Sequence, residues 1–255
     1  MIWLLLALLV LAILILPGVW VQHVLKKHSA PRNDYPGNGG DMARHLLAKL
    51  ELNDVQVEAT DQGDHYDPRS KTVRLTSDKL DGKSLTAVVV AAHEVGHALQ
   101  HARKEALFQS RTGFAVLAYW MQRIAPLALL LAPFLAVVAP VASRFALVVA
   151  VGAMLIGTLV HIVTLPVEWD ASFGKALPLL REGEYLDERD MKAAHSILTA
   201  AALTYVAASL VSLLNIGRWL RFLRRGIIIG RCLLLGRNTQ KSTNNPAQFT
   251  IQLIT

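Results

Sequence analysis

Residues 124–165 read IAPLALLLAPFLAVVAPVASRFALVVAVGAMLIGTLVHIVTL and contain one charged side chain, Arg144. Together with Ser143 it separates two uncharged runs, 124–142 and 145–165. A helix needs about 20 predominantly apolar residues to cross the hydrocarbon core of a bilayer, which is the length of each run. Because the connection between them is so short, the two runs predict a tight transmembrane helical hairpin.

Two further runs, Met1–Val21 and Ser196–Gly217, also lack Asp, Glu, Lys and Arg. In the whole chain of 255 residues, 53% are hydrophobic and 18% charged, a composition that excludes disordered, collagen-like and disulfide-scaffold proteins. The first run has no basic start and no small-residue cleavage site, which favours an uncleaved anchor over a signal peptide. Four such runs favour a multi-pass membrane protein over a soluble protein with one buried helical core.

The net charge of +7 is a property of the C-terminal part of the chain. Residues 191–255 hold eight basic and no acidic side chains, whereas the rest of the chain is nearly balanced. Such a distribution is typical of a basic segment beside a membrane and argues against a nucleic-acid partner.

The polar stretch after the first run predicts a small α+β domain. Its apolar residues recur first at helical spacing and then alternate as in strands. The expected elements are a helix over 41–53 capped by Asp41, two or three short strands that include 55–59 and 72–76, and a helix over 85–107 capped by Ser84.

The expected fold is therefore mainly α, a multi-pass membrane protein with about four transmembrane helices and a small α+β zincin-like domain. The expected parts are a transmembrane anchor (1–21), a linker (22–40), the polar zincin-like domain (41–123), transmembrane helices (124–142 and 145–165), a polar segment (166–195), a transmembrane helix (196–217), and a basic amphipathic segment with a polar tail (218–255).

The helix expected over 85–107 contains HEVGH at residues 93–97. His93 and His97 lie one turn apart on the same helix face, so both imidazoles can reach one Zn²⁺ at about 2.0 to 2.1 Å. Glu94 is then the natural general base for a zinc-bound water. The alternative is a chance match on an ordinary amphipathic helix, which the preceding strand and apolar run disfavour.

A catalytic zinc usually has three protein ligands, and Glu168 is the candidate for the third. It follows the second run of the hairpin, where Pro166 can open a new helix. The alternative is a helix N-terminal carboxylate stabilised by the helix dipole. Asp170 is expected either to accept the ring N–H of a ligand histidine or to be a surface cap. His101 is too far along its helix for the same ion and is expected to support the ligands or face solvent.

Three segments carry a resemblance to a known family: HEVGHALQ at 93–100, LPVEWDAS at 165–172 and AALTYVAA at 201–208. Over roughly residues 2–220 the chain resembles the YugP-like neutral zinc metallopeptidases of bacterial membranes. The resemblance implies a multi-pass peptidase of the bacterial plasma (inner) membrane.

The resemblance also implies His93 and His97 as ligands, Glu94 as base and Glu168 as the third ligand. A looser similarity links the chain to the CAAX-prenyl and HtpX-type membrane peptidases. Their glutamate and aspartate are four residues apart, whereas Glu168 and Asp170 are two apart, so the role of Asp170 stays open.

The expected function is hydrolysis of peptide bonds by zinc-activated water, with one Zn²⁺ ion as cofactor and the lipid bilayer and a peptide or protein substrate as partners. His195 and Tyr205 are candidate stabilisers of the transition state. The substrate is expected to pair with the strand over 71–76. An intramembrane zinc protease is disfavoured because charged residues flank the short histidine helix. A non-catalytic membrane adaptor with the same fold remains an alternative.

The order of segments sets a topological constraint. The histidine helix precedes the hairpin and Glu168 follows it, so Glu168 returns to the side of the histidines. Basic residues flank both sides of the last run, so the positive-inside rule conflicts with itself. Similarity to the HtpX type implies a cytoplasmic catalytic face.

Overall fold

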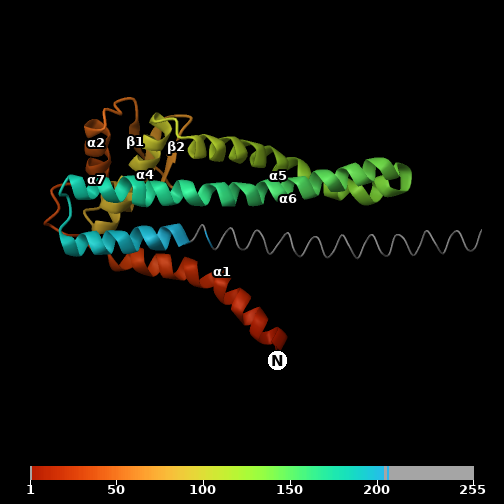
Figure 1. Cartoon of the computed structure of the whole chain (residues 1–255), viewed down its shortest axis with the longest axis horizontal. Helices are drawn as coiled ribbons and strands as arrows, with labels where there is room; N and C mark the ends of the chain where they lie inside the picture. Colours follow the sequence, from red (N-terminus) through yellow and green to blue (C-terminus); the bar gives the residue numbers. More distant parts are fainter. Residues whose placement is uncertain (1, 204–205, 207–255) are drawn as a thin grey trace, which may run out of the picture. The chain divides into compact units, whose positions relative to one another are not determined.

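The computed structural model describes residues 2–203 and 206, and within them the chain is mainly helical with one small sheet (Figure 1). Residues 188–203 form a further helical stretch. The helices with assigned bounds are α1 (Ile2–Lys27), α2 (Gly39–Lys49), α3 (Ser77–Leu80), α4 (Leu85–Ala102), α5 (Ala106–Val138), α6 (Pro140–Trp169), the π-helix η1 (Asp170–Ala176) and α7 (Leu177–Glu182).

The sheet has three short strands: β1 (Gln56–Ala59), β2 (His65–Asp67) and β3 (Thr72–Leu75). The central strand is β3, which pairs parallel to β1 and antiparallel to β2. Since both edges of β3 are already paired, the prediction that substrate adds to this strand was wrong. The outer edges of the sheet belong to β1 and β2 instead.

Helix α4 is the core of the polar part of the chain. It begins as predicted at Ser84, whose Oγ accepts a hydrogen bond of 3.2 Å from the N–H of Ala87. Almost every side chain along it is buried, which is typical of a helix enclosed on all sides. It packs against α2, the sheet and η1.

Two predicted helix boundaries in this part were wrong. The helix capped by Ser84 ends at Ala102 rather than 107, because Lys104 takes the left-handed conformation (φ 53°) and breaks it. The first helix of the domain is capped by Asn38, not by Asp41. Asn38 Oδ1 accepts from the N–H of Asp41 at 2.8 Å, and Asp41 Oδ2 accepts from the N–H of Asn38 at 3.1 Å, which is a capping box.

Helices α5 and α6 lie side by side and form the predicted hairpin (Figure 1). Their turn is at Ala139, not at Ser143 and Arg144, because Pro140 already opens α6. Ser143 instead lies in the first turn of α6, where its Oγ donates to the carbonyl of Ala132 at 2.9 Å.

Large apolar side chains cover the outside of this hairpin, among them Phe134 and Phe145, about seven-tenths exposed. Among the described residues, two helical stretches, not four, are long and apolar enough to cross a membrane: Ala106–Ala132 and Val141–Glu182. The first predicted run forms most of α1, and most of the run 196–217 lies outside the described residues.

Helix α6 continues past the end of the predicted span. Pro166 lies inside it, rather than opening a new helix as predicted. After Trp169 the helix widens into η1 and then continues as α7. Short π-helical segments are rare in proteins, and those that occur are often found at functional sites.

Gly96 allows α4 and η1 to approach each other closely. A Cβ at this position would lie 2.8 Å from the carbonyl oxygen of Ala171 and 3.3 Å from Cβ of Lys175. Since the first contact is with backbone, the helices would have to move apart to accept any side chain.

We expect Gly96→Ala to lower the free energy of unfolding by about 1–3 kcal/mol, the usual cost of overpacking. The matched control is Gly113→Ala in α5, where a Cβ meets nothing within 4 Å. That change should be neutral or stabilising by up to about 1 kcal/mol, because alanine favours helix more than glycine. Thermal unfolding of the purified proteins in detergent measures both. Equal effects would contradict the close-packing role of Gly96.

Candidate metal centre

The side chains of His93, His97 and Glu168 meet at one point. Glu168 Oε2 lies 3.2 Å from Nε2 of His93 and 3.2 Å from Nε2 of His97. The two imidazole rings come from consecutive turns of α4, with centroids 4.8 Å apart, whereas the carboxylate comes from the last turn of α6. The potential ligand atoms of the three residues all lie within 4.8 Å of one another.

This geometry fits a zinc ion. Tetrahedral coordination at 2.0–2.1 Å places any two ligand atoms about 3.3 Å apart, close to the 3.2 Å between Glu168 Oε2 and each Nε2. Two imidazoles and one carboxylate are also a donor set of catalytic zinc sites, with a fourth position left for water or substrate. The residues present therefore fit one metal ion.

Burial explains why the carboxylate needs a positive partner. Glu168 is 1% exposed, and an ionised carboxylate so far from water is costly unless it is paired. Its Oε1 makes no hydrogen bond to the residues that the structure describes, although Nη2 of Arg111 lies 3.1 Å away as an ion-pair partner. Because Glu168 lies at the C-terminal end of α6, the interpretation as an N-terminal helix carboxylate was wrong.

Gln100 determines which nitrogen of His97 carries the proton. Its Nε2 donates to the carbonyl of Val167 at 2.9 Å and to Oδ2 of Asp170 at 2.8 Å, and both of these groups only accept. The Gln100 Oε1 must then face Nδ1 of His97, 2.9 Å away, so that Nδ1–H is the donor. The Nε2 of His97 is therefore left with its lone pair directed at the cluster, as metal binding requires.

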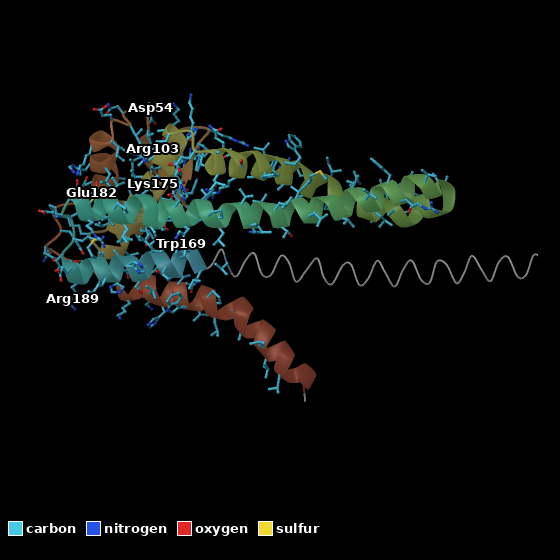
Figure 2. The ribbon with its side chains drawn as sticks, in the orientation of Figure 1. Asp54, Arg103, Trp169, Lys175, Glu182 and Arg189 are labelled. Carbon is cyan, nitrogen blue, oxygen red and sulfur yellow. The ribbon has the colours of Figure 1, made fainter. Side chains whose placement is uncertain are left out.

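Asp170 contacts Gln100, which in turn contacts Nδ1 of His97, so its carboxylate does not accept the ring N–H of a ligand histidine directly. Its carboxylate also accepts from Nζ of Lys175 at 2.8 Å, and the same ammonium lies 3.1 Å from Oε1 of Glu105. Lys175 is labelled in Figure 2. These bonds stabilise the ionised form of Asp170.

The other ligand histidine has a polar contact of its own. Nδ1 of His93 lies 3.2 Å from the hydroxyl of Ser172, a fully buried residue in η1. A serine hydroxyl can accept the Nδ1 proton and so leave Nε2 of His93 free for a metal. The π-helical segment thus supplies both Asp170 and Ser172 to the neighbourhood of the histidines.

Glu94 is buried beside the cluster and is 6% exposed. Among the described residues its carboxylate makes no hydrogen bond or ion pair. Burial raises its pKa to about 7, aided by the charge of Glu168 and opposed by that of His93. A carboxyl group with a pKa near neutrality can both accept and release a proton at physiological pH.

The remaining candidate residues lie apart from the cluster. His101 accepts or donates a hydrogen bond of 2.8 Å with the hydroxyl of Tyr66 and stacks on Phe108. His195 is exposed and its ring packs against Phe173, with no contact to the cluster among the described residues. Tyr205 lies outside the described residues.

Sequence reasoning did not identify three residues around the cluster: Gln100, Ser172 and Arg111. Helical spacing was a signal for the first two, since Gln100 lies three residues after His97 and Ser172 four after Glu168. No comparable signal marks Arg111, which reaches Glu168 from a different helix.

Comparisons with known proteins find a zinc peptidase family and a membrane protease. The model of a family described as "Putative neutral zinc metallopeptidase" matches residues 2–224. The chain is 34% identical over 216 residues to "Putative membrane protease YugP" from Bacillus subtilis (strain 168), an alignment that covers 81% of this chain and 92% of that protein. No solved structure matches.

The hydrogen bonds of Gln100 lead to a test of the metal centre. We expect Gln100→Leu to weaken zinc binding about 10- to 100-fold, because His97 loses the acceptor that orients its ring. The matched control is Gln109→Leu, an exposed glutamine on α5. Competition with a zinc chelator of known affinity measures the change. Identical zinc affinities in the two variants would contradict the orienting role of Gln100.

Proposed function

Because the chain belongs to the family described as "Putative neutral zinc metallopeptidase", we propose that it is a membrane-bound zinc metalloendopeptidase with Glu94 as its general base. The observation that carries the proposal is the position of one Glu168 oxygen, 3.2 Å from the Nε2 atoms of both histidines. Glu168 and His97 are 71 residues apart in sequence, so no local structure forces them together. A shared metal ion accounts for their proximity.

In the proposed site His93, His97 and Glu168 hold one zinc ion. Zinc supplies Lewis acidity, which acidifies a water molecule and polarises the scissile carbonyl. Glu94 takes the proton of the attacking water and later gives it to the leaving amine. No described residue competes for the Glu94 carboxylate, which leaves it free for both transfers. Burial of the cluster keeps bulk water away and strengthens these electrostatic interactions.

The proposed membrane arrangement follows from the hairpin of α5 and α6. Both helices present apolar side chains outward, and the relative from Bacillus subtilis is named a membrane protease. We propose that α5 and α6 both cross the bilayer, which makes the protein multi-pass. The hairpin then returns Glu168 to the side of α4, and the catalytic face is cytoplasmic.

An intramembrane protease fits the structure less well. Helix α4, which contains both histidines, is packed against the sheet and α2 and is not among the candidate membrane spans. Of the three proposed ligands, Glu168 alone lies in a candidate span, so we propose that cleavage takes place where α4 meets the end of α6.

The proposed base is tested by Glu94→Gln. This change keeps the side-chain shape and leaves both histidines free, so zinc content should stay at the wild-type level. Hydrolysis of a casein-derived fluorogenic peptide should fall at least about 100-fold, because general bases typically contribute 10²–10⁴. The control is Glu182→Gln, an exposed glutamate at the end of α7. Wild-type turnover in Glu94→Gln would exclude Glu94 as the base.

The proposed third ligand is tested by Glu168→Ala, with Glu182→Ala as control. Removal of one of three ligands should leave the purified protein with less than one zinc per chain after dialysis, and hydrolysis should be lost with the metal. Mass spectrometry of the metal content measures the first effect directly. If Glu168→Ala kept both zinc and activity, another residue would have to be the ligand. A wild-type protein that binds no zinc at all would favour the adaptor alternative.

A further inference from the structure

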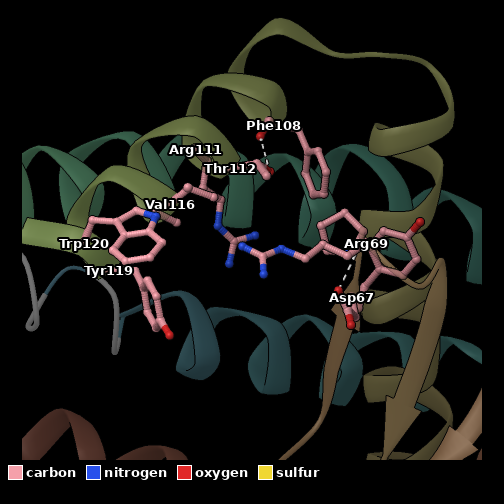
Figure 3. A pocket seen from close by; sticks show the side chains of 11 residues that line it. Asp67, Arg69, Phe108, Arg111, Thr112, Val116, Tyr119 and Trp120 are labelled. Atoms are coloured by element: carbon pink, nitrogen blue, oxygen red, sulfur yellow. Dashed lines mark hydrogen bonds between the residues drawn. The ribbon is translucent and has the colours of Figure 1, made fainter. Parts of the chain in front are cut away.

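A cavity of about 620 Å³ lies beside the metal centre, between the turn that follows β2 and the first turns of α5 (Figure 3). This volume is in the usual range of small-ligand pockets. Figure 3 shows the guanidinium groups of Arg69 and Arg111 pointing toward one another within it. Two like charges that face each other repel, unless an anion lies between them.

The positive charge in the cavity is not neutralised by its own acidic residue. Asp67 also lines the cavity, but its carboxylate already accepts hydrogen bonds from Arg74 at 2.8 Å, from Ser70 at 2.9 Å and from the backbone N–H of Arg69 at 3.0 Å. Among the described residues, the Arg69 guanidinium has no hydrogen-bond or ion-pair partner. Arg111 has one, Glu168 Oε1, and the rest of its donors are free for another acceptor.

The cavity adjoins the proposed catalytic centre through two residues. Arg111 lies 3.1 Å from Oε1 of Glu168, and Phe108, which lines the cavity, has its ring centroid 6.1 Å from that of His97. An anion held by the two arginines would therefore lie close to a peptide bond placed at the metal centre.

We propose that Arg69 and Arg111 bind a carboxylate of the peptide substrate close to the bond that is cleaved. This inference rests on the proposed function and names its substrate class: peptides with an acidic side chain or a free C-terminus near the cleavage site. Guanidinium groups suit this role because they bind carboxylates in bidentate geometry. The aromatic walls at Phe108 and Trp120 would pack against an apolar neighbour of the acidic residue.

Two features favour a peptide over an anionic lipid headgroup as the occupant. One wall is formed by Tyr66 and Asp67 of the outer strand β2, to which an extended peptide can add as a further strand. The contact of Arg111 with Glu168 also places the cavity next to the metal centre, where a peptide substrate is expected.

The test measures binding to the full-length, zinc-loaded Glu94→Gln protein in phosphatidylcholine nanodiscs. The probes are fluorescein-labelled decapeptides of Gly and Ala with one Phe, flanked by Glu or by Gln, each made as the C-terminal acid and as the amide. Fluorescence anisotropy gives the dissociation constants. Arg69→Gln and Arg69→Lys are compared with Arg103→Gln, an exposed arginine at the end of α4 that does not line the cavity.

We expect at least one carboxylate-bearing peptide to bind about tenfold more tightly than the Gln amide, the scale of one charge-assisted hydrogen bond. Arg69→Gln should abolish this preference, Arg69→Lys should keep part of it, and Arg103→Gln should leave it unchanged. If the preference follows Glu, the carboxylate is a side chain, and if it follows the acid form, it is the C-terminus.

Equal affinity for all four peptides, or a preference that survives Arg69→Gln, would overturn the proposal. Arg69-dependent binding of dihexanoyl phosphatidylglycerol that acidic peptides do not displace would assign the cavity to a lipid headgroup instead. Zinc content and hydrolysis of the Gln amide by the parent protein are measured in parallel. If both are present without a carboxylate preference, only this inference fails, whereas their absence means that the proposed function fails.

Discussion

The buried carboxylate of Glu168 is the group on which the rest of the structure depends. An ionised side chain that is 1% exposed requires positively charged or hydrogen-bonding groups nearby. Three side chains from other helices surround the Glu168 carboxylate: His93, His97 and Arg111. This requirement joins α4 and the start of α5, which are neighbours in the chain, to the distant end of α6. One Glu168 oxygen faces Arg111 and the other faces the two histidines, so the two sides of the carboxylate have separate roles. The side toward the histidines has the spacing of a zinc site, and the side toward Arg111 faces the cavity.

The packing around the carboxylate is adapted to hold these groups in place. Gly96 lets α4 approach η1 so closely that Gln100 can reach both Val167 and Asp170. The bonds continue from Asp170 to Lys175, which also pairs with Glu105 in the turn between α4 and α5. A polar chain therefore runs from His97 to the start of α5. Because every donor of Gln100 is occupied, the ring of His97 is oriented by the protein before any metal binds.

Sequence patterns were sufficient where one local signal determines the structure. The Ser84 cap, the apolar run that follows it and the four-residue spacing of the histidines all lie within α4, and the two uncharged runs were sufficient to predict the hairpin. Sequence patterns gave wrong predictions where several local signals competed. Pro166 was interpreted as the start of a new helix, but α6 continues through it to Trp169. The pairing of β3 on both edges and the contact of Gln100 with Asp170 depend on segments that are distant in the chain, and no spacing in the sequence encodes them.

The most direct test of the metal centre is zinc K-edge X-ray absorption spectroscopy of the purified full-length protein. A zinc ion held by His93, His97 and Glu168 should give a first shell of about four nitrogen and oxygen atoms at 2.0–2.1 Å, with the multiple-scattering signature of two imidazoles. A first shell that contains sulfur, or the signature of three or more imidazoles, would contradict the site described here. A zinc ion bound with six oxygen neighbours and no imidazole would contradict it equally.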